Sequence, residues 1–258
     1  MSVVKYKDLI MQIAKRNIHI KYKGSMLGVF WSFLNPLFLL AVYTFVFGFA
    51  FKTKWGESSL TSYPLILFSG LIFHFFIIEL LATSSQLING NANYVKKVVF
   101  PLEVLILSNF LAQIFNLLIG ASLLILAVII TRGDIINVAL AFVVVLPPFI
   151  ILTLGVSYIF GALGAFVKDI VHVVNLASTL FLFVSPILFP LSVFPSLVKW
   201  VVYFNPISIA VIEFRAIAFN IETFSVSAYT IYFAISILIF FCGREMFNRL
   251  SRGFADVV

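Results

Sequence analysis

Long apolar runs, separated by short polar segments, constrain this sequence more than any other feature. A helix needs about 20 apolar residues to cross the hydrocarbon core of a bilayer, which is roughly 30 Å thick. The runs that approach or exceed this length are Leu27–Phe51, Tyr63–Leu87, Leu102–Thr131, Val138–Phe166, Val171–Phe189 and Val226–Cys242. Hydrophobic residues make up 62% of the chain and charged residues only 10%, so a soluble fold could not hide its apolar surface. We therefore predict an all-α integral membrane protein with six transmembrane helices.

The segment between the fifth and sixth runs, residues 190–225, is apolar but is interrupted by Pro195 and Pro206. Its apolar pieces are too short to cross the bilayer, so we expect a re-entrant or interfacial helical hairpin there. No internal repeat or low-complexity linker divides the chain, which indicates one transmembrane domain over residues 1–258. Within it we expect an interface helix in residues 1–26, five spans in 27–189, and the last span with a cytoplasmic tail in 226–258.

The polar segment before the first run has the pattern of a surface helix. Its apolar side chains fall on one helical stripe, and the cations Lys5, Lys15 and Arg16 point elsewhere. The stripe consists of Tyr6, Ile10, Ile13 and Ile20. We expect an amphipathic helix along the inner membrane face, with its cations at the lipid headgroups. Most of the 17 lysines and arginines fall on the side that carries both termini, which places both termini in the cytoplasm.

Residues suited to catalysis or metal binding are sparse within the apolar runs. Glu79 is the only carboxylate well inside a run, and His74 lies about 140° away round the helix, so the two should not share a face. The single cysteine, Cys242, excludes an internal disulfide, and no Cys/His pattern indicates a metal site. Because no Gly-Lys dipeptide occurs, the chain has no P-loop for ATP hydrolysis. We expect no catalytic residue, metal or cofactor on this chain.

A family resemblance rests on several short stretches taken in order. They are YKGSMLGVFWSFLNPLFLLAVYTFVF, NYVKKVVFPLEVL, FVKDI, SPILFPLSVFP and YFNPIS. Together they resemble the membrane subunits of ABC-2 type polysaccharide exporters, which export O-antigen, teichoic acid or capsule chains. The resemblance covers nearly the whole chain and implies a homodimeric permease in the bacterial cytoplasmic (inner) membrane. It also implies a lipid-linked polysaccharide as substrate and two copies of a separate cytoplasmic P-loop ATPase, to which ATP and Mg would bind.

The resemblance gives roles to two cytoplasmic segments. It places Lys21 and Lys23 where a lipid-linked, often phosphate-bearing glycan would arrive, and cations attract such a phosphate. It also places a short coupling helix, seated on the ATPase, in the loop between the second and third spans. The expected coupling residues are Asn91, Asn93, Tyr94, Lys96 and Lys97, with Lys168 and Asp169 of the next inside loop as secondary candidates. The alternative for the first loop is an ordinary cytoplasmic turn rich in positive charge.

One aromatic stripe of the first span is predicted to line the substrate path. At about 100° per residue its members lie on one side of the helix, with Thr44 beside them. The stripe consists of Phe33, Tyr43, Phe47 and Phe51. We choose it because a phenolic hydroxyl in mid-span needs a polar partner, which a sugar or a water-filled lumen provides. The fifth span carries a similar stripe with Ser178, Phe181, Ser185 and Phe189, and the alternative for both stripes is that they only pack.

Two other functions fit parts of the sequence. An ABC-2 permease for a lipid or a drug would keep the same fold, although the abundance of aromatic residues favours sugar. An integral-membrane transferase acting on lipid-linked sugars would need a cluster of acidic or histidine residues, which the sequence does not show. The net charge of +7 is typical of loops held on the cytoplasmic side, and we expect no nucleic acid partner.

Overall fold

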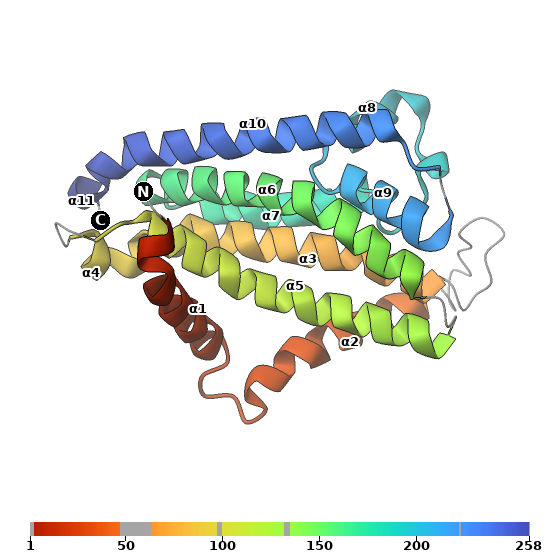
Figure 1. The fold of residues 1–258 in the computed structure, drawn as a ribbon, viewed down its shortest axis with the longest axis horizontal. Coiled ribbons are helices and arrows are strands. Elements are labelled where there is room, and N and C mark those ends of the chain that lie inside the picture. Colours follow the sequence, from red (N-terminus) through yellow and green to blue (C-terminus); the bar gives the residue numbers. More distant parts are fainter. Residues whose placement is uncertain (1–2, 47–62, 97–99, 132–134, 222, 258) are drawn as a thin grey trace.

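The computed structural model describes residues 3–46, 63–96, 100–131, 135–221 and 223–257. Most of these residues are helical, and the described parts of the chain contain no strand. The α-helices are α1 (Lys7–Lys21), α2 (Trp31–Tyr43), α3 (Tyr63–Leu87), α4 (Ala92–Val95), α5 (Glu103–Thr131), α6 (Ile136–Phe166), α7 (Ile170–Val184), α8 (Ser196–Phe204), α9 (Ser208–Phe219), α10 (Val226–Leu250) and α11 (Phe254–Val257). The long helices run side by side along one direction, as in a membrane bundle (Figure 1). This arrangement confirms the all-α prediction.

Five helical segments of the described chain are long and apolar enough to cross a membrane, and they correspond to five of the six predicted spans. They are Gly28–Val46, Tyr63–Leu87, Glu103–Thr131, Ile136–Phe166 and Val226–Val257. The last helix continues well beyond Cys242, the predicted end of its span. These apolar helices identify a multi-pass membrane protein.

The predicted fifth span, Val171–Phe189, is longer than the helix that the structure shows. α7 contains 15 residues, so it measures roughly 22 Å at about 1.5 Å per residue, and it ends at Val184. Ser185 is extended, with ψ at 155°, because Pro186 follows it and disfavours the helical conformation at the preceding residue. The predicted length of this helix is therefore wrong, and Ser185 and Phe189 lie beyond its end.

Two short helices, α8 and α9, occupy the segment for which the sequence predicts a hairpin. They are bent by 96° relative to each other, at a break that contains Asn205 and Pro206. A pair bent in this way is either a broken span or a re-entrant loop. It lies at the end of the bundle opposite to both chain termini (Figure 1).

α3 forms the centre of the core. In its most apolar stretch 78% of the residues are buried, and α3 is surrounded by α5, α6, α7 and α9. Phe73 contacts the rings of Phe149 and Phe214 edge to face, with ring centroids 5.0 and 5.5 Å apart. The first span, Gly28–Val46, makes far fewer buried contacts, because only 6% of its most apolar stretch is buried.

α1 crosses one side of the bundle near the end at which the termini lie (Figure 1). It buries Ile10 and Ile13 against Val104 of α5 and leaves Lys15 exposed, which confirms the amphipathic pattern. Ile20, the last member of the predicted stripe, is an exception and is 57% exposed. The stripe is therefore buried only over the part of α1 that contacts α5.

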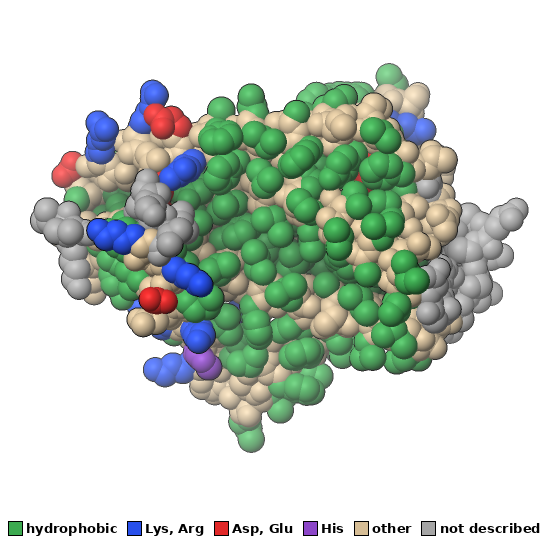
Figure 2. Space-filling model, in the orientation of Figure 1, with side chains coloured by type: hydrophobic (Ala, Val, Ile, Leu, Met, Phe, Trp, Pro, Cys, Tyr) green, Lys and Arg blue, Asp and Glu red, His purple; other side chains and the backbone are tan. Residues whose placement is uncertain are grey.

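The step from α1 to α2 contains two glycines with positive φ. Gly24 has a φ of +85° and Gly28 a φ of +52°, a backbone conformation that favours glycine. On the face drawn in Figure 2, most lysine and arginine side chains gather at the end that carries the termini, and the middle of the bundle is apolar. This distribution fits a membrane belt with one basic end.

Candidate functional site

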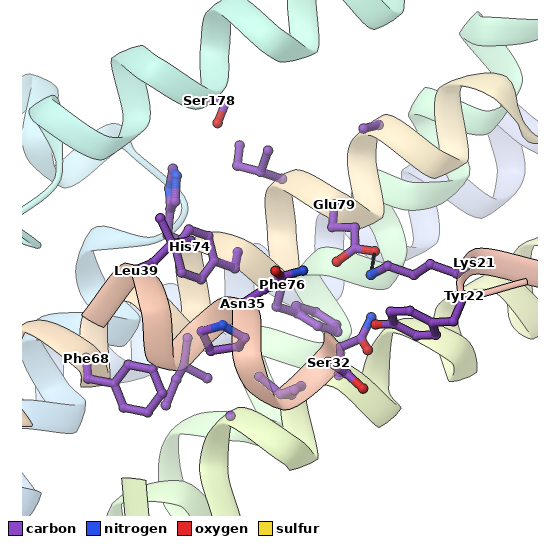
Figure 3. A pocket seen from close by; sticks show the side chains of 18 residues that line it. Lys21, Tyr22, Ser32, Asn35, Leu39, Phe68, His74, Phe76, Glu79 and Ser178 are labelled. Carbon is purple, nitrogen blue, oxygen red and sulfur yellow. Dashed lines mark hydrogen bonds and ion pairs between the residues drawn. The ribbon is translucent and has the colours of Figure 1, made fainter. Parts of the chain in front are cut away.

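A cavity of about 320 Å³ lies between α2, α3, α5 and α7, beside the turn that follows α1 (Figure 3). Its apolar wall includes the rings of Phe68, Phe75 and Phe76. Its polar lining consists of Lys21, Tyr22, Ser32, Asn35, His74, Glu79, Asn116 and Ser178. Pockets for small ligands measure about 300–1,000 Å³ and combine apolar walls with a few polar groups. The cavity has these properties, so we take it as the candidate site.

Lys21 and Glu79 form an ion pair at the exposed edge of the cavity (Figure 3). The pair joins the last residue of α1 to α3, and the two side chains are 37% and 32% exposed. A carboxylate within a membrane segment is costly unless it is paired, and Lys21 supplies the partner. Lys21, which was expected to meet a phosphate, is therefore already bound to a carboxylate, whereas Lys23 is exposed.

His74 reaches the cavity from a different side of α3. It is 3% exposed, and its Nδ1 atom has no hydrogen-bond partner among the described residues. His74 and Glu79 point in different directions, as their spacing predicts, but the cavity is wide enough for both to line it (Figure 3). Their separation along the helix therefore did not exclude a shared site.

Amide side chains on α5, beginning with Asn116 in the cavity wall, form hydrogen bonds with one another and with hydroxyl groups of α3. Asn116 donates to Oε1 of Gln113 at 3.0 Å, and Gln113 donates to Oγ1 of Thr83 at 3.5 Å. One turn earlier on α5, Nδ2 of Asn109 donates to Oγ1 of Thr83 at 3.0 Å and to Oγ of Ser84 at 3.2 Å. Hydrogen bonds of this kind hold helices together inside a membrane. They fix the position of α5, and with it the position of Asn116 in the cavity wall.

The loop between α3 and α5 contains a short helix, α4, at the position expected for a coupling helix. Asn91 and Tyr94 do not point freely away from the bundle. Arg16 of α1 donates to the Tyr94 hydroxyl at 3.0 Å and to Oδ1 of Asn91 at 3.4 Å, and its guanidinium lies over the Tyr94 ring. Asn93 and Lys96 are exposed. Sequence reasoning missed Arg16, although its position beside the apolar stripe of α1 was a usable signal.

The remaining coupling candidates are less constrained by the structure. Lys168 and Asp169 are exposed in the turn between α6 and α7. Lys97 lies outside the described residues. No contact shown here assigns a role to these three residues, so their part in coupling stays a prediction.

Among the described residues predicted to line the substrate path, Ser178 of the fifth span borders this cavity, whereas those of the first span do not. Phe33, Tyr43 and Thr44 are half-buried on the first span, and Phe47 and Phe51 lie outside the described residues. Their role in a path stays a prediction.

The predicted stripe on the fifth span is partly taken up by contacts within the subunit. Phe181 and Phe189 are half-buried against the core. Ser185 is fully buried, donates to the carbonyl of Phe181 and accepts from Nδ2 of Asn205 at 2.7 Å. Ser185 therefore anchors the hairpin junction in this subunit.

Arg215 of α9 is a buried charge whose role sequence reasoning missed. It is 3% exposed, and its guanidinium donates to the carbonyl of Ile66 at 2.7 and 3.1 Å and to that of Ile187 at 3.2 Å. It also donates to the carbonyl of Pro186 and to Oγ of Ser69. The arginine thus ties the hairpin to α3 and to the chain that follows α7.

The described residues contain no group of three or more His, Cys, Asp or Glu side chains that could hold a metal ion. The cavity is lined by the Lys21–Glu79 ion pair, by several neutral polar groups and by aromatic rings. Such a lining can hold a ligand by hydrogen bonds and ring contacts.

Comparison with known proteins agrees with the fold. Residues 8–219 match the family described as ABC-2 type transporter. Two relatives from Klebsiella pneumoniae, both named O-antigen export system permease protein RfbA, are 27% and 26% identical over 97% of this chain and 95% of theirs. A protein of the same name from Myxococcus xanthus is 25% identical over 100% of this chain and 98% of its own. The family match runs from α1 to the end of α9 and contains every residue that lines the cavity. This chain therefore belongs to the ABC-2 type transporter family of membrane proteins.

Proposed function

We propose that this chain is the channel-forming membrane subunit of an ATP-driven exporter that moves a lipid-linked polysaccharide across the bacterial cytoplasmic membrane. The observation that carries the proposal is its similarity, over nearly the full length of the chain, to O-antigen export permeases. Two copies of the chain form the path. Two copies of a separate P-loop ATPase bind ATP and Mg and supply the energy.

The weak coverage of the helices predicted to line the path supports a homodimer. Only 6% of the most apolar stretch of the first span is buried, and on α7 Leu176 is 70% and Leu180 63% exposed. Apolar side chains of a membrane helix face either lipid or another protein surface. A second copy that covers part of this surface would enclose a path between the two subunits.

The basic end of the bundle supports the proposed orientation and ATPase contact. Both termini and α4 lie at this end (Figure 1), and lysines and arginines gather there (Figure 2). In the proposal this end is cytoplasmic, because positively charged loops are retained on that side. The exposed Asn93 and Lys96 on and beside α4 are then available to the ATPase.

Deletion of the gene in its own host tests the proposal. We expect the surface polysaccharide to be lost and its lipid-linked form to accumulate inside the membrane, as measured by surface labelling and by extraction of the carrier lipid. A plasmid copy with Cys242→Ser should restore export, since Cys242 is exposed and has no role in the proposal. Unchanged surface polysaccharide would instead favour a permease for a lipid or a drug. Polysaccharide that is absent both inside and outside would favour a transferase.

The predicted path can be tested within the same complementation assay. Tyr43→Ala removes a half-buried aromatic ring of the chosen stripe, whereas Phe45→Ala removes an exposed ring of the opposite stripe. We expect Tyr43→Ala to lower export at least several-fold while the subunit still assembles with its ATPase. Phe45→Ala should export normally. The reverse ranking of the two variants would show that the other stripe lines the path.

A further inference from the structure

We propose that the cavity between α2, α3, α5 and α7 is a binding site for a single neutral sugar ring. This inference rests on the proposed polysaccharide cargo and adds a site within each subunit, apart from the aromatic stripe of the first span that is predicted to line the path. At about 320 Å³ the cavity is near the lower limit of ligand pockets, so it accepts a small unit rather than a length of chain.

A buried histidine atom without a partner in the cavity points to a hydrogen-bonding ligand. The His74 side chain is 97% buried, yet its Nδ1 has no partner among the described residues. A buried polar group without a partner costs about 1–3 kcal/mol, so a ligand that satisfies it is favoured. Asn35 of α2, which is exposed, and Ser178 of α7, which is half-buried, also line the cavity and offer polar groups to a ligand. The hydroxyl groups of a sugar can both donate to and accept from such groups.

The balance of charge in the cavity favours a neutral ligand over a phosphate. Among the described residues Lys21 is the only lysine or arginine that lines the cavity, and this lysine is paired with Glu79. An anion would have to break the ion pair or approach the carboxylate, and either requirement weakens binding. A neutral hydroxyl can instead donate to a free lone pair of Glu79 and leave the pair intact.

The aromatic rings in the wall favour a sugar over a lipid tail. Phe68, Phe75 and Phe76 line the cavity, and the C–H face of a sugar ring can pack against such aromatic surfaces. An acyl chain would fill the same space but would leave the buried Nδ1 of His74 without a partner. Only a ligand that is apolar on its faces and polar at its rim matches both parts of the lining.

Direct binding to the full chain tests this inference without requiring transport. The protein in lipid nanodiscs is mixed with the methyl glycosides of glucose, galactose, mannose and rhamnose, and saturation-transfer difference NMR is recorded against empty nanodiscs. We expect at least one glycoside to receive saturation on its ring protons. Ser178→Leu fills the cavity from α7, and His74→Leu removes the unpartnered donor and acceptor. Each should weaken binding about tenfold, as expected for the loss of a buried hydrogen bond.

A control variant and a competing anion distinguish a neutral sugar site from an anion site and from non-specific binding. Thr179→Leu changes the next residue of α7, which is exposed and does not line the cavity, so it should bind as the unmodified protein does. Binding of no glycoside above empty nanodiscs overturns the inference, as does equal binding in Ser178→Leu and Thr179→Leu. Displacement by inorganic phosphate at matched concentration identifies an anion site and also overturns it. Because neither ATPase nor export enters the assay, these outcomes are separate from the gene-deletion test of the exporter function.

Discussion

The surroundings of Arg215 show how one buried cation determines the position of a whole segment. Its Nη2 atom lies so close to α3 that a Cβ at Gly70 would approach it to 2.7 Å. The absence of a side chain at Gly70 therefore makes room for the guanidinium. The carbonyls that the arginine satisfies belong to α3 and to the proline-containing turn after α7. Removal of the arginine would take this donor from the carbonyls of Pro186 and Ile187, whereas the carbonyl of Ile66 would still accept from Oγ of Ser69.

Arg215→Met should destabilise the protein by about 2–4 kcal/mol, because the buried carbonyls of Pro186 and Ile187 lose their donor. The measurement is thermal or denaturant unfolding of the detergent-solubilised chain, together with protease sensitivity of the hairpin. Lys199→Met is a matched control, because it removes a cation from the same hairpin at a half-exposed position. An Arg215→Met variant as stable as Lys199→Met would contradict the role assigned to the guanidinium.

Arg16 offers a second test at the scale of one residue. Arg16→Ala removes the hydrogen bonds to Tyr94 and Asn91 that link α1 to the loop carrying α4. We expect faster amide hydrogen exchange in residues 89–95 and weaker coupling of ATP hydrolysis to export. Lys15→Ala removes the neighbouring, exposed cation and should leave both quantities unchanged. Equal exchange rates in the two variants would show that the Arg16 contacts do not hold the loop.

The backbones of α6 and α10 approach each other closely where the two helices cross. A Cβ at Gly155 would lie 2.6 Å from the backbone of Phe240, and one at Gly243 would lie 2.3 Å from the carbonyl oxygen of Gly155. Both helices therefore use glycine to bring their backbones together, as small residues do at helix interfaces in membranes. Backbone atoms cannot move aside as a flexible side chain can, so the contact tolerates no added volume.

Gly243→Ala should lower the free energy of unfolding by about 1–3 kcal/mol, the usual cost of overpacking, because the added Cβ pushes α10 away from α6. The readout is the unfolding midpoint of the purified chain. Gly90→Ala serves as the matched control, because a Cβ at Gly90 meets nothing within 4 Å and its φ is not positive. A loss of stability as large for Gly90→Ala would refute the explanation based on helix contact.

For the molecule as a whole, the position of the basic end predicts its orientation in the membrane. In a Cys242→Ser background, an impermeant thiol reagent added to intact cells should label Ser196→Cys at the start of α8 but not Arg249→Cys near the end of α10. Both positions are exposed, so access rather than burial decides the result. Labelling of Arg249→Cys from outside would reverse the orientation or exclude an even number of crossings.

The sequence predicts those features of the molecule that depend on neighbouring residues. The spans follow from the length of the apolar runs, and α1 follows from a periodic stripe. The early end of α7 also had a local signal in the Ser185-Pro186 pair, although the apolar run hides it. Arg215 had none, because its bond to Ile66 joins residues 149 positions apart in the chain. The cavity was equally beyond prediction, since His74, Asn116 and Ser178 meet only after three helices have packed.

The first span and α3 differ in how much of each is buried, and this difference affects the free energy needed to move each helix. α3 cannot shift without disrupting the aromatic core, whereas α2 can shift with the loss of few buried contacts. Segments with few buried contacts are the ones that open at the lowest free energy. α2 forms one wall of the cavity and α3 forms another. The volume of the cavity is thus bounded by the most tightly and the most loosely held of the membrane helices, and it can vary while the rest of the fold keeps its shape.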